Sequence, residues 1–175
     1  MAKKPVLICD IINDVRRVFH VVHEVSKKAK QKTGLTSPQL WAIKSISESA
    51  NIKVSDLACR MYLHPATVVG ILNRLEKMDL IRRSRQDADR RVVRISLTSA
   101  GKKLVKKSPE VAQGLLVAGL ETLTVKRLEN LSRGLGDLVS ILGAQEIPPR
   151  LILSREVNVP NNKSLGRKLR GIAGS

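Results

Sequence analysis

Arginine side chains dominate the run RRSRQDADRR at residues 82–91, which holds five arginines and two aspartates. Guanidinium groups spaced this closely can bind several phosphates of one nucleic-acid backbone. The excess extends beyond this run: residues 74–107 contain twelve basic and four acidic residues, and the whole 175-residue chain has a formal net charge of +17. This pattern predicts binding of a polyanion, with nucleic acid the leading candidate and an anionic membrane the second.

Residues that could catalyse a reaction or bind a metal do not occur in a recognisable arrangement. Cys9 and Cys59 are 50 positions apart, without a zinc-ligand spacing or a disulfide framework. With no glycine-rich phosphate loop and no nucleophile and base pair, we expect no enzyme, catalytic residue, cofactor or metal site. The aromatic residues are only Phe19, Trp41 and Tyr62, too few for a module that stacks single-stranded bases. Double-stranded DNA is therefore the favoured partner.

The apolar segments are too short to cross a membrane. No run approaches the roughly 20 apolar residues that a bilayer requires. Asp10 and Asp14 fall within the first apolar segment, which is atypical of a secretory signal. We therefore expect a cytoplasmic protein without a membrane partner.

The N-terminal elements can be read from hydrophobic spacing. Apolar residues recur every three to four positions over 6–32, which predicts one long amphipathic helix that ends at Gly34. A threonine, a serine and a proline at 36–38 then predict the start of a second helix, which runs to about residue 49.

Two short helices and a hairpin follow. Ser55 is predicted to cap the first of these helices, and Pro65 suits the first position of the second. Joined by a tight turn, they make a helix-turn-helix. An extended segment is predicted to begin at residues 80–81 and a returning strand to lie at 92–97, so the polar run at 84–91 is predicted to be the turn of a β-hairpin.

Two further helical segments complete the expected fold. Thr98 is predicted to cap the first, which Pro109 kinks or restarts, and Thr124 to cap the second, which Gly143 ends. Residues beyond 149 are rich in Asn, Gly, Lys and Arg, and six basic residues against one acidic residue occur at 150–175. This composition predicts a flexible basic tail.

The order of these elements, read with Asp89, Arg91 and Leu97-Thr98 in the wing, resembles the MarR family. The segment HPATVVGILNRLEKMDLI at 64–81 is similar to the family's recognition-helix segment, and the resemblance covers residues 8–143. It implies a homodimer whose first, fifth and sixth helices pair about a two-fold axis, with two lobes meeting successive major grooves of a pseudo-palindromic operator. Asp79 departs from the family, which usually has glycine at this position; aspartate tolerates the left-handed conformation less well.

The expected fold class is mainly α with a small β-hairpin wing (α+β), a winged helix-turn-helix with N- and C-terminal dimerisation helices. Its predicted parts are an N-terminal dimerisation helix at 1–35, a winged helix-turn-helix DNA-binding lobe at 36–98, C-terminal dimerisation helices at 99–147 and a flexible basic tail at 148–175.

Base-reading candidates lie on the outward face near the start of the recognition helix. They are His64, Ala66, Thr67, Val69, Gly70 and Asn73. Small apolar side chains suit contact with thymine methyl groups, and Asn73 can pair with an adenine edge or bond only a phosphate. Gly70 costs the helix about 1 kcal/mol relative to alanine; it either allows close approach to DNA or reflects a lack of selection at an exposed site.

The wing and its surroundings supply the expected phosphate contacts. Arg90 is predicted to enter the minor groove or grip its phosphates, while Asp89 and Arg91 brace the hairpin. Further contacts to the DNA backbone are predicted for Arg82, Arg83, Arg85, Ser37, Gln39, Arg60 and Arg74. Affinity should then fall by about 0.9 logarithmic units per neutralised phosphate for each tenfold rise in salt.

The resemblance also implies a response to a small effector, since family members commonly bind phenolic or anionic aromatic ligands between the dimer helices and the DNA lobe. The candidate ligand contacts are His20, His23, Trp41 and Lys44, for which packing or surface roles are the alternative. Cys9 resembles the reactive cysteine of the family's peroxide-sensing branch. Its register differs by about a turn and the supporting tyrosines are missing, so an inert cysteine is the favoured interpretation.

These features together predict a sequence-specific, double-stranded DNA-binding transcriptional regulator, a repressor released by a small-molecule ligand. Two alternatives stay open. The charge and the basic tail would also suit a weakly specific DNA-coating or architectural protein. A redox-sensing regulator that uses Cys9 is the other alternative.

Overall fold

The part of the chain that the computed structural model describes, residues 3–84, 93–149 and 151, forms seven helices and three short strands. In chain order they are α1 (Lys3–Thr33), α2 (Ser37–Ser47), β1 (Ile52–Lys53), α3 (Val54–Arg60), α4 (Pro65–Lys77), β2 (Ile81–Ser84), β3 (Arg94–Leu97), α5 (Ser99–Lys107), α6 (Ala112–Glu121) and α7 (Val125–Ile141). The strands make one antiparallel sheet in the order β1-β3-β2. The mainly helical fold with a small β wing that the sequence predicts is therefore confirmed.

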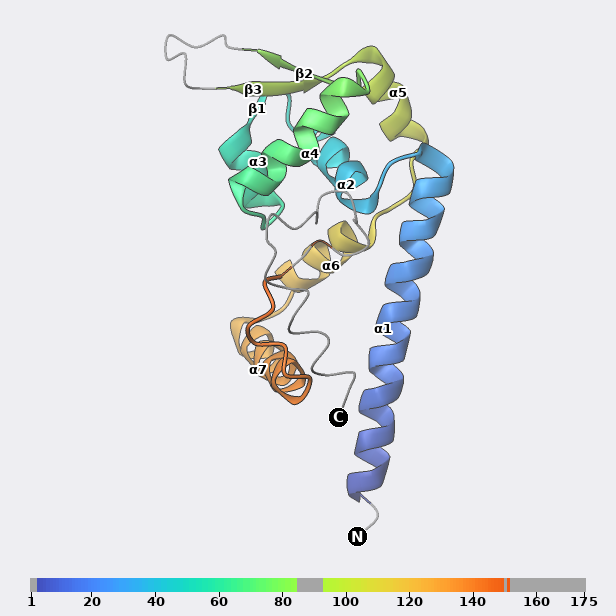
Figure 1. Cartoon of the computed structure of the whole chain (residues 1–175), viewed down its shortest axis with the longest axis vertical. Helices are drawn as coiled ribbons and strands as arrows, with labels where there is room; N and C mark the ends of the chain where they lie inside the picture. Colours follow the sequence, from blue (N-terminus) through green and yellow to red (C-terminus); the bar gives the residue numbers. More distant parts are fainter. Residues whose placement is uncertain (1–2, 85–92, 150, 152–175) are drawn as a thin grey trace.

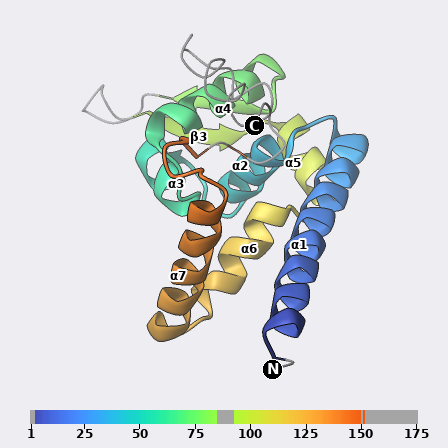
Figure 2. The same cartoon turned by 60° about the horizontal axis from the view of Figure 1, so that its bottom comes forward.

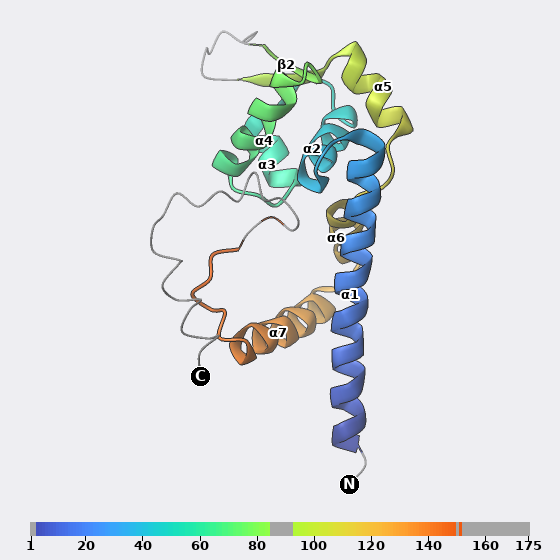
Figure 3. The ribbon, with the colours of Figure 1, turned by 45° about the vertical axis from the view of Figure 1, so that its right-hand side comes forward.

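The elements separate into a lobe and a set of projecting helices (Figure 1). Helices α2 to α5 and the sheet form the lobe, and α1 runs away from it as one long rod. Helices α6 and α7 lie on the same side of the lobe as α1, so three helices project together (Figure 2). Figure 3 shows α1 reaching further from the lobe than α7 does.

Helix α4 supplies the centre of the lobe's core. Its fully buried residues, which lie on one side of the helix, are Val68, Ile71, Leu72 and Leu75. They belong to one cluster with buried residues of α2, α3 and the sheet, Ile81 and Ile95 among them. Burial of this stripe fixes the rotation of α4 about its axis, because turning the helix would expose these side chains to water.

Strand β1 lies within residues 51–54, where the sequence predicts a short extended link between two helices. Ile52 pairs with Ile95, so the link adds a third strand to the hairpin. Helix α3 then begins at Val54, with Lys53 as its N-cap. The prediction that Ser55 caps this helix is therefore wrong: pairing at β1 sets where the helix begins, and the Ser55 hydroxyl donates instead to Asp56 Oδ1 (3.1 Å).

The end of α4 has a regular left-handed cap, although it lacks glycine. Asp79 has φ of +52°. Its N–H donates to the Glu76 carbonyl (2.9 Å), and the Leu80 N–H donates to the Leu75 carbonyl (3.0 Å). This is the hydrogen-bond pattern of a Schellman motif. Asp79 thus adopts the left-handed conformation that glycine usually provides at this position.

Thr98 joins this cap to the start of α5. Its hydroxyl oxygen accepts from the Gly101 N–H (3.0 Å) and donates to the Asp79 carbonyl (2.7 Å). Thr98 therefore caps α5 as predicted, and it also links α5 to the end of α4. Beyond α5 the chain restarts at Ala112 rather than continuing as one kinked helix, since Pro109 lies between α5 and α6.

The predicted tail at 148–175 lies mostly outside the described residues. Leu151, which is described, is half-buried and packs against the core of the lobe. Within the described ranges, no helix has the length and apolar content needed to cross a bilayer.

Candidate nucleic-acid interface

The start of α4 is exposed and is capped by a side chain. His64 is the N-cap residue, and its Nδ1 accepts from the Ala66 N–H (3.3 Å). Pro65 occupies the first helical position, where no backbone donor is needed. His64 therefore has a structural role at the start of α4, the helix that is predicted to enter the major groove.

The outward face of α4 lies opposite its buried stripe. At 100° per residue, Ala66, Gly70, Asn73 and Lys77 share this face. Among the base-reading candidates, His64, Ala66, Val69 and Asn73 are exposed and Thr67 and Gly70 are half-buried. The structure therefore keeps all six candidates at the surface of one helix.

Gly70 is not required by the packing of the chain. A Cβ added there meets no heavy atom within 4 Å, so alanine would fit. The fold gives no reason for a residue that weakens the helix. Close approach of a partner's backbone or phosphate remains a reason for glycine.

Arg83 of β2 connects the wing to α4. Its Nη2 donates to Asn73 Oδ1 (2.7 Å), and its Nη1 lies 3.4 Å from Glu76 Oε2. The side chain of Arg83 is 27% exposed. Its guanidinium therefore lies against the recognition helix, and Asn73 is part of a bridge between two elements.

The structure describes only some of the other residues predicted for the wing and the DNA backbone contacts. Arg82 is exposed on β2, and Arg74 is half-buried on α4. The predicted contacts Arg85 and Arg90 and the predicted bracing residues Asp89 and Arg91 lie outside the described residues. Their roles stay predictions.

Two predicted phosphate contacts, Ser37 and Gln39, need correction because they are buried. Ser37 and Gln39 are 2% and 5% exposed. The Ser37 hydroxyl donates to Ser26 Oγ (2.8 Å), and Gln39 Oε1 accepts from the Thr36 N–H (2.9 Å) at the start of α2. Both side chains are thus enclosed by the chain itself. The Arg60 guanidinium donates to Glu48 Oε2 (3.1 Å) and to the Ser45 carbonyl (3.3 Å). The Arg60 side chain is still 41% exposed, so its phosphate contact stays a prediction.

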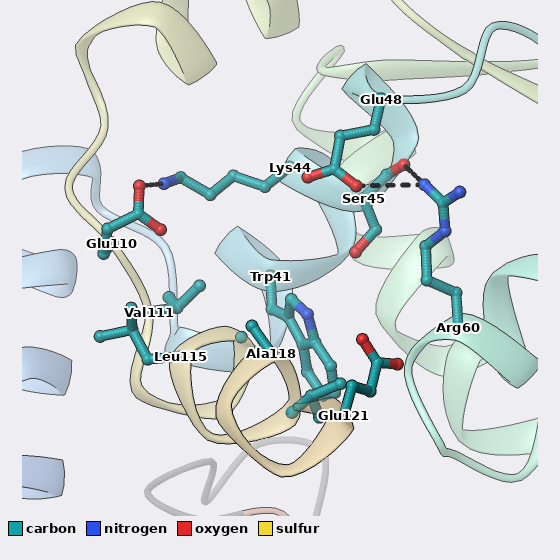
Figure 4. Close-up of a pocket in the computed structure, with 12 residues that line it drawn as sticks. Trp41, Lys44, Ser45, Glu48, Arg60, Glu110, Val111, Leu115, Ala118 and Glu121 are labelled. Atoms are coloured by element: carbon teal, nitrogen blue, oxygen red, sulfur yellow. Dashed lines mark hydrogen bonds and ion pairs between the residues drawn. The ribbon is translucent and has the colours of Figure 1, made fainter. Parts of the chain in front are cut away.

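A pocket of about 440 Å³ lies between α2, α3 and α6, and we call it the α2–α6 pocket (Figure 4). Its lining residues are Trp41, Lys44, Ser45, Glu48, Arg60, Glu110, Val111, Gly114, Leu115, Val117, Ala118 and Glu121. Trp41 forms an apolar wall at the centre of the view. Two of the predicted ligand contacts, Trp41 and Lys44, therefore meet in one cavity.

The charges in the α2–α6 pocket are largely paired. Lys44 Nζ lies 2.7 Å from Glu110 Oε1, and Arg60 pairs with Glu48 as described above. Glu121 adds a third carboxylate to the lining. His20 and His23 are exposed on α1 and are not among the lining residues, so the four predicted ligand contacts are not brought together.

Tyr62 connects the turn of the helix-turn-helix to α6, a contact that the sequence does not reveal. Tyr62 has φ of +49°, and its hydroxyl donates to Glu121 Oε1 (3.1 Å). The two residues are 59 positions apart, so no local pattern could pair them. The only available signal is a polar aromatic residue in a tight turn.

The pKa of Tyr62 is raised above its ordinary value of about 10, first because its hydroxyl donates to Glu121 and then because that carboxylate repels the phenolate. The folded-state pKa is thus the higher one. The contribution of this contact to stability is fully present below the ordinary pKa and is lost as the pH rises through the folded-state pKa. Because the chain has one tyrosine, tyrosinate absorbance reports this residue alone.

We expect Glu121→Gln to lower the pKa of Tyr62 toward about 10. Glu110→Gln, which removes another carboxylate of the same pocket, is the matched control and should leave the titration unchanged. Identical titrations for Glu121→Gln and the wild type would contradict the hydrogen bond.

Cys9 lies exposed on α1, where its sulfur accepts from the Asn13 side-chain amide (3.5 Å). The hydroxyl of the single tyrosine is bonded to Glu121 instead. No tyrosine therefore supports a thiolate at Cys9.

Large apolar side chains are exposed along the projecting helices. On α1 they are Val6, Leu7, Ile8, Ile11, Ile12, Val18, Phe19 and Val21; on α6, Leu115 and Leu116; and on α7, Val125, Leu131, Leu135, Val139 and Ile141. None of the 17 residues of α7, all of them described, is buried. Apolar faces of this extent are typical of surfaces that another chain covers.

Comparisons with known proteins agree with this architecture. Residues 35–93 match the family model of the MarR family. The HTH-type transcriptional repressor MdtR of Bacillus subtilis (strain 168) is 34% identical over 95 residues, which are 54% of this chain and 61% of MdtR. The chain thus spans about three fifths of that relative's length.

A second relative and a solved structure extend the match. The organic hydroperoxide resistance transcriptional regulator of the same strain is 31% identical over 122 residues, 68% of this chain and 82% of that protein. A MepR-like protein crystallised with pseudoligands has a TM-score of 0.50 and 25% identity, covering 81% of this chain and 97% of that chain. The helix-turn-helix, the wing and these similarities together show that the chain belongs to the MarR family of winged helix-turn-helix, DNA-binding transcriptional regulators, which are not enzymes.

Proposed function

We propose that the protein is a sequence-specific repressor that binds double-stranded DNA as a homodimer and is released by a small molecule. The observation that carries the proposal is the outward face of α4, held opposite a fully buried stripe and joined to the wing by Arg83. A helix presented in this way can enter the major groove while basic residues beside it contact phosphates. The relative MdtR, a repressor by name, supports the direction of regulation.

The projecting helices are the proposed dimer contact. Residues 1–35 and 99–147 supply the dimerisation helices, and residues 36–98 the DNA-binding lobe. The exposed apolar faces of α1, α6 and α7 would be covered by the same faces of a second copy about a two-fold axis. Two lobes then present two copies of α4, which suits a pseudo-palindromic operator.

The α2–α6 pocket is the proposed effector site. It joins the DNA lobe to α6, and its Trp41 wall suits a small aromatic ligand. Lys44 is the cation available to an anionic effector, which would have to displace Glu110 from it. The pseudoligand complex of the MepR-like protein supports binding of small molecules by this fold. His20 and His23 are not part of this proposal.

The net charge of +17 favours one alternative, a DNA-coating protein with little sequence preference. The two functions differ in one measurable ratio. A specific regulator should bind a site mapped in its own genome at least about a thousandfold more tightly than a random duplex at physiological salt. Equal affinities for both duplexes would favour the coating protein and contradict the proposal.

Gly70→Ala tests whether α4 meets the DNA. Since a Cβ at Gly70 contacts nothing in the chain, alanine should stabilise α4 by about 1 kcal/mol. If the helix lies in the groove with its backbone close to DNA, the same methyl group should weaken binding to the mapped site. A gel-shift titration at fixed salt, with thermal unfolding measured in parallel, checks both effects. Unchanged affinity would remove Gly70 from the interface.

A further inference from the structure

The bridge from Arg83 to α4 determines which hydrogen-bonding groups Asn73 can offer to a base. The Arg83 guanidinium is placed by two residues of α4: it donates to Asn73 Oδ1 at 2.7 Å and lies 3.4 Å from the carboxylate of Glu76. A contact of 2.7 Å from a charged donor is at the short end for such hydrogen bonds. The amide oxygen of Asn73 is thus engaged within the chain, and its side-chain nitrogen remains for a ligand.

Recognition of adenine by asparagine needs both ends of the amide. The oxygen must accept from the adenine N6 amino group while the nitrogen donates to N7. An amino group that approached Asn73 Oδ1 would also approach the N–H groups of Arg83, so donors would face donors around a positive charge. The bridge therefore disfavours the adenine edge.

The side-chain groups of Asn73 and Arg83 that remain available to a base are all hydrogen-bond donors. Asn73 contributes its side-chain NH₂, and the Arg83 guanidinium lies beside it. Guanine presents two acceptors, N7 and O6, in the major groove. On the outward face of α4, Ala66 and Gly70 have no side-chain hydrogen-bonding groups, so Asn73 is the residue of this face in the first two turns that can read a base, with Lys77 one turn further on.

We propose that Arg83 is a positioning residue that makes Asn73 select guanine over adenine at one base pair of each half-site. This inference rests on the proposed function, because it requires α4 to lie in the major groove. Arg83 is held by Glu76 and acts on the base through Asn73, rather than as the phosphate contact that the sequence predicts.

The test is selection of binding sites from a duplex library with randomised bases, using the full-length protein. The wild type should select guanine at the base pair that faces Asn73. Arg83→Met keeps much of the aliphatic side chain but frees the amide oxygen, so the ratio of guanine to adenine at that position should fall by about tenfold. Asn73→Ala should flatten the preference at the same position.

Arg82→Met is the matched control, because Arg82 is the exposed neighbour on the same strand. It should lower affinity similarly for every sequence and leave the base preferences unchanged. Glu76→Gln removes the anchor of the guanidinium without touching Arg83 or Asn73. It should shift the preference in the same direction as Arg83→Met, and it keeps the test decisive if Arg83→Met fails to fold.

Two results would overturn the inference while leaving the proposed function intact. In the first, Arg83→Met lowers affinity for all sequences and reduces the salt dependence by about 0.9 logarithmic units without changing any base preference, as a phosphate contact would. In the second, Arg83→Met and Asn73→Ala alter different base pairs. A wild-type protein that selects no motif at all would instead contradict the proposed function itself.

Discussion

Gly101→Ala is expected to lower the free energy of unfolding by about 3 kcal/mol. Gly101 lies in the first turn of α5, where an added Cβ would overlap the carbonyl oxygen of Leu80. That oxygen accepts from the Thr98 N–H (3.1 Å). The obstacle is backbone and cannot move aside by rotating a side chain, so α5 and the start of β2 would have to separate.

Chemical unfolding of the variant and the wild type at equal protein concentration checks this prediction, since the stability of a dimer depends on concentration. Gly70→Ala is the matched control, because it places the same methyl group in a helix where no atom lies within 4 Å. It should raise stability by about 1 kcal/mol. Equal effects of the two substitutions would contradict the close packing of α5 on the end of α4.

Leu135→Asp is expected to convert the proposed dimer into monomers. Leu135 is 53% exposed in the single chain and lies on the apolar face of α7 between Leu131 and Val139. In the proposed dimer the substitution buries an unpaired carboxylate twice, once in each subunit. With a cost of several kcal/mol for each buried charge, subunit affinity should fall by about a thousandfold or more.

Sedimentation analysis measures the loss of the dimer, and a gel-shift titration measures its consequence for DNA. A monomer presents one lobe and should bind a mapped site much more weakly, because it loses the second, linked contact. Ser140→Asp is the control: it introduces the same charge on the opposite face of α7 and should leave the protein dimeric. A dimeric Leu135→Asp variant with full affinity for DNA would contradict the proposed interface.

Local residues determine where most of the helices begin and end, so these helix ends are predictable from the sequence. Pro65 starts α4, Thr98 caps α5, and Gly34 and Gly143 take positive φ values where α1 and α7 end. Each signal acts within one or two turns, because caps and turns are formed by neighbours in the chain. The buried stripe of α4 is equally legible from its spacing.

The contacts of the polar residues are not predictable in the same way. Ser37 looks like a surface residue at the start of a helix, yet it is buried and its hydroxyl donates to Ser26, eleven positions earlier in the chain. The sequence offers no partner for Arg60, yet its guanidinium donates to Glu48, twelve positions earlier in the chain. The residue type determines which hydrogen bonds and ion pairs a side chain can form. The packing of segments that are distant in the sequence determines which partner it actually contacts.

The sequence by itself determined a basic winged helix-turn-helix, because charge, periodicity and capping are properties of neighbouring residues. The tertiary structure alone decided how its polar groups are used. It placed Arg83 against Asn73 and Glu76, paired Tyr62 with Glu121, and put Trp41 and Lys44 into one pocket. The physical reason is that such bonds depend on how elements pack against one another, and that packing is fixed by burial of the apolar core rather than by the polar residues themselves.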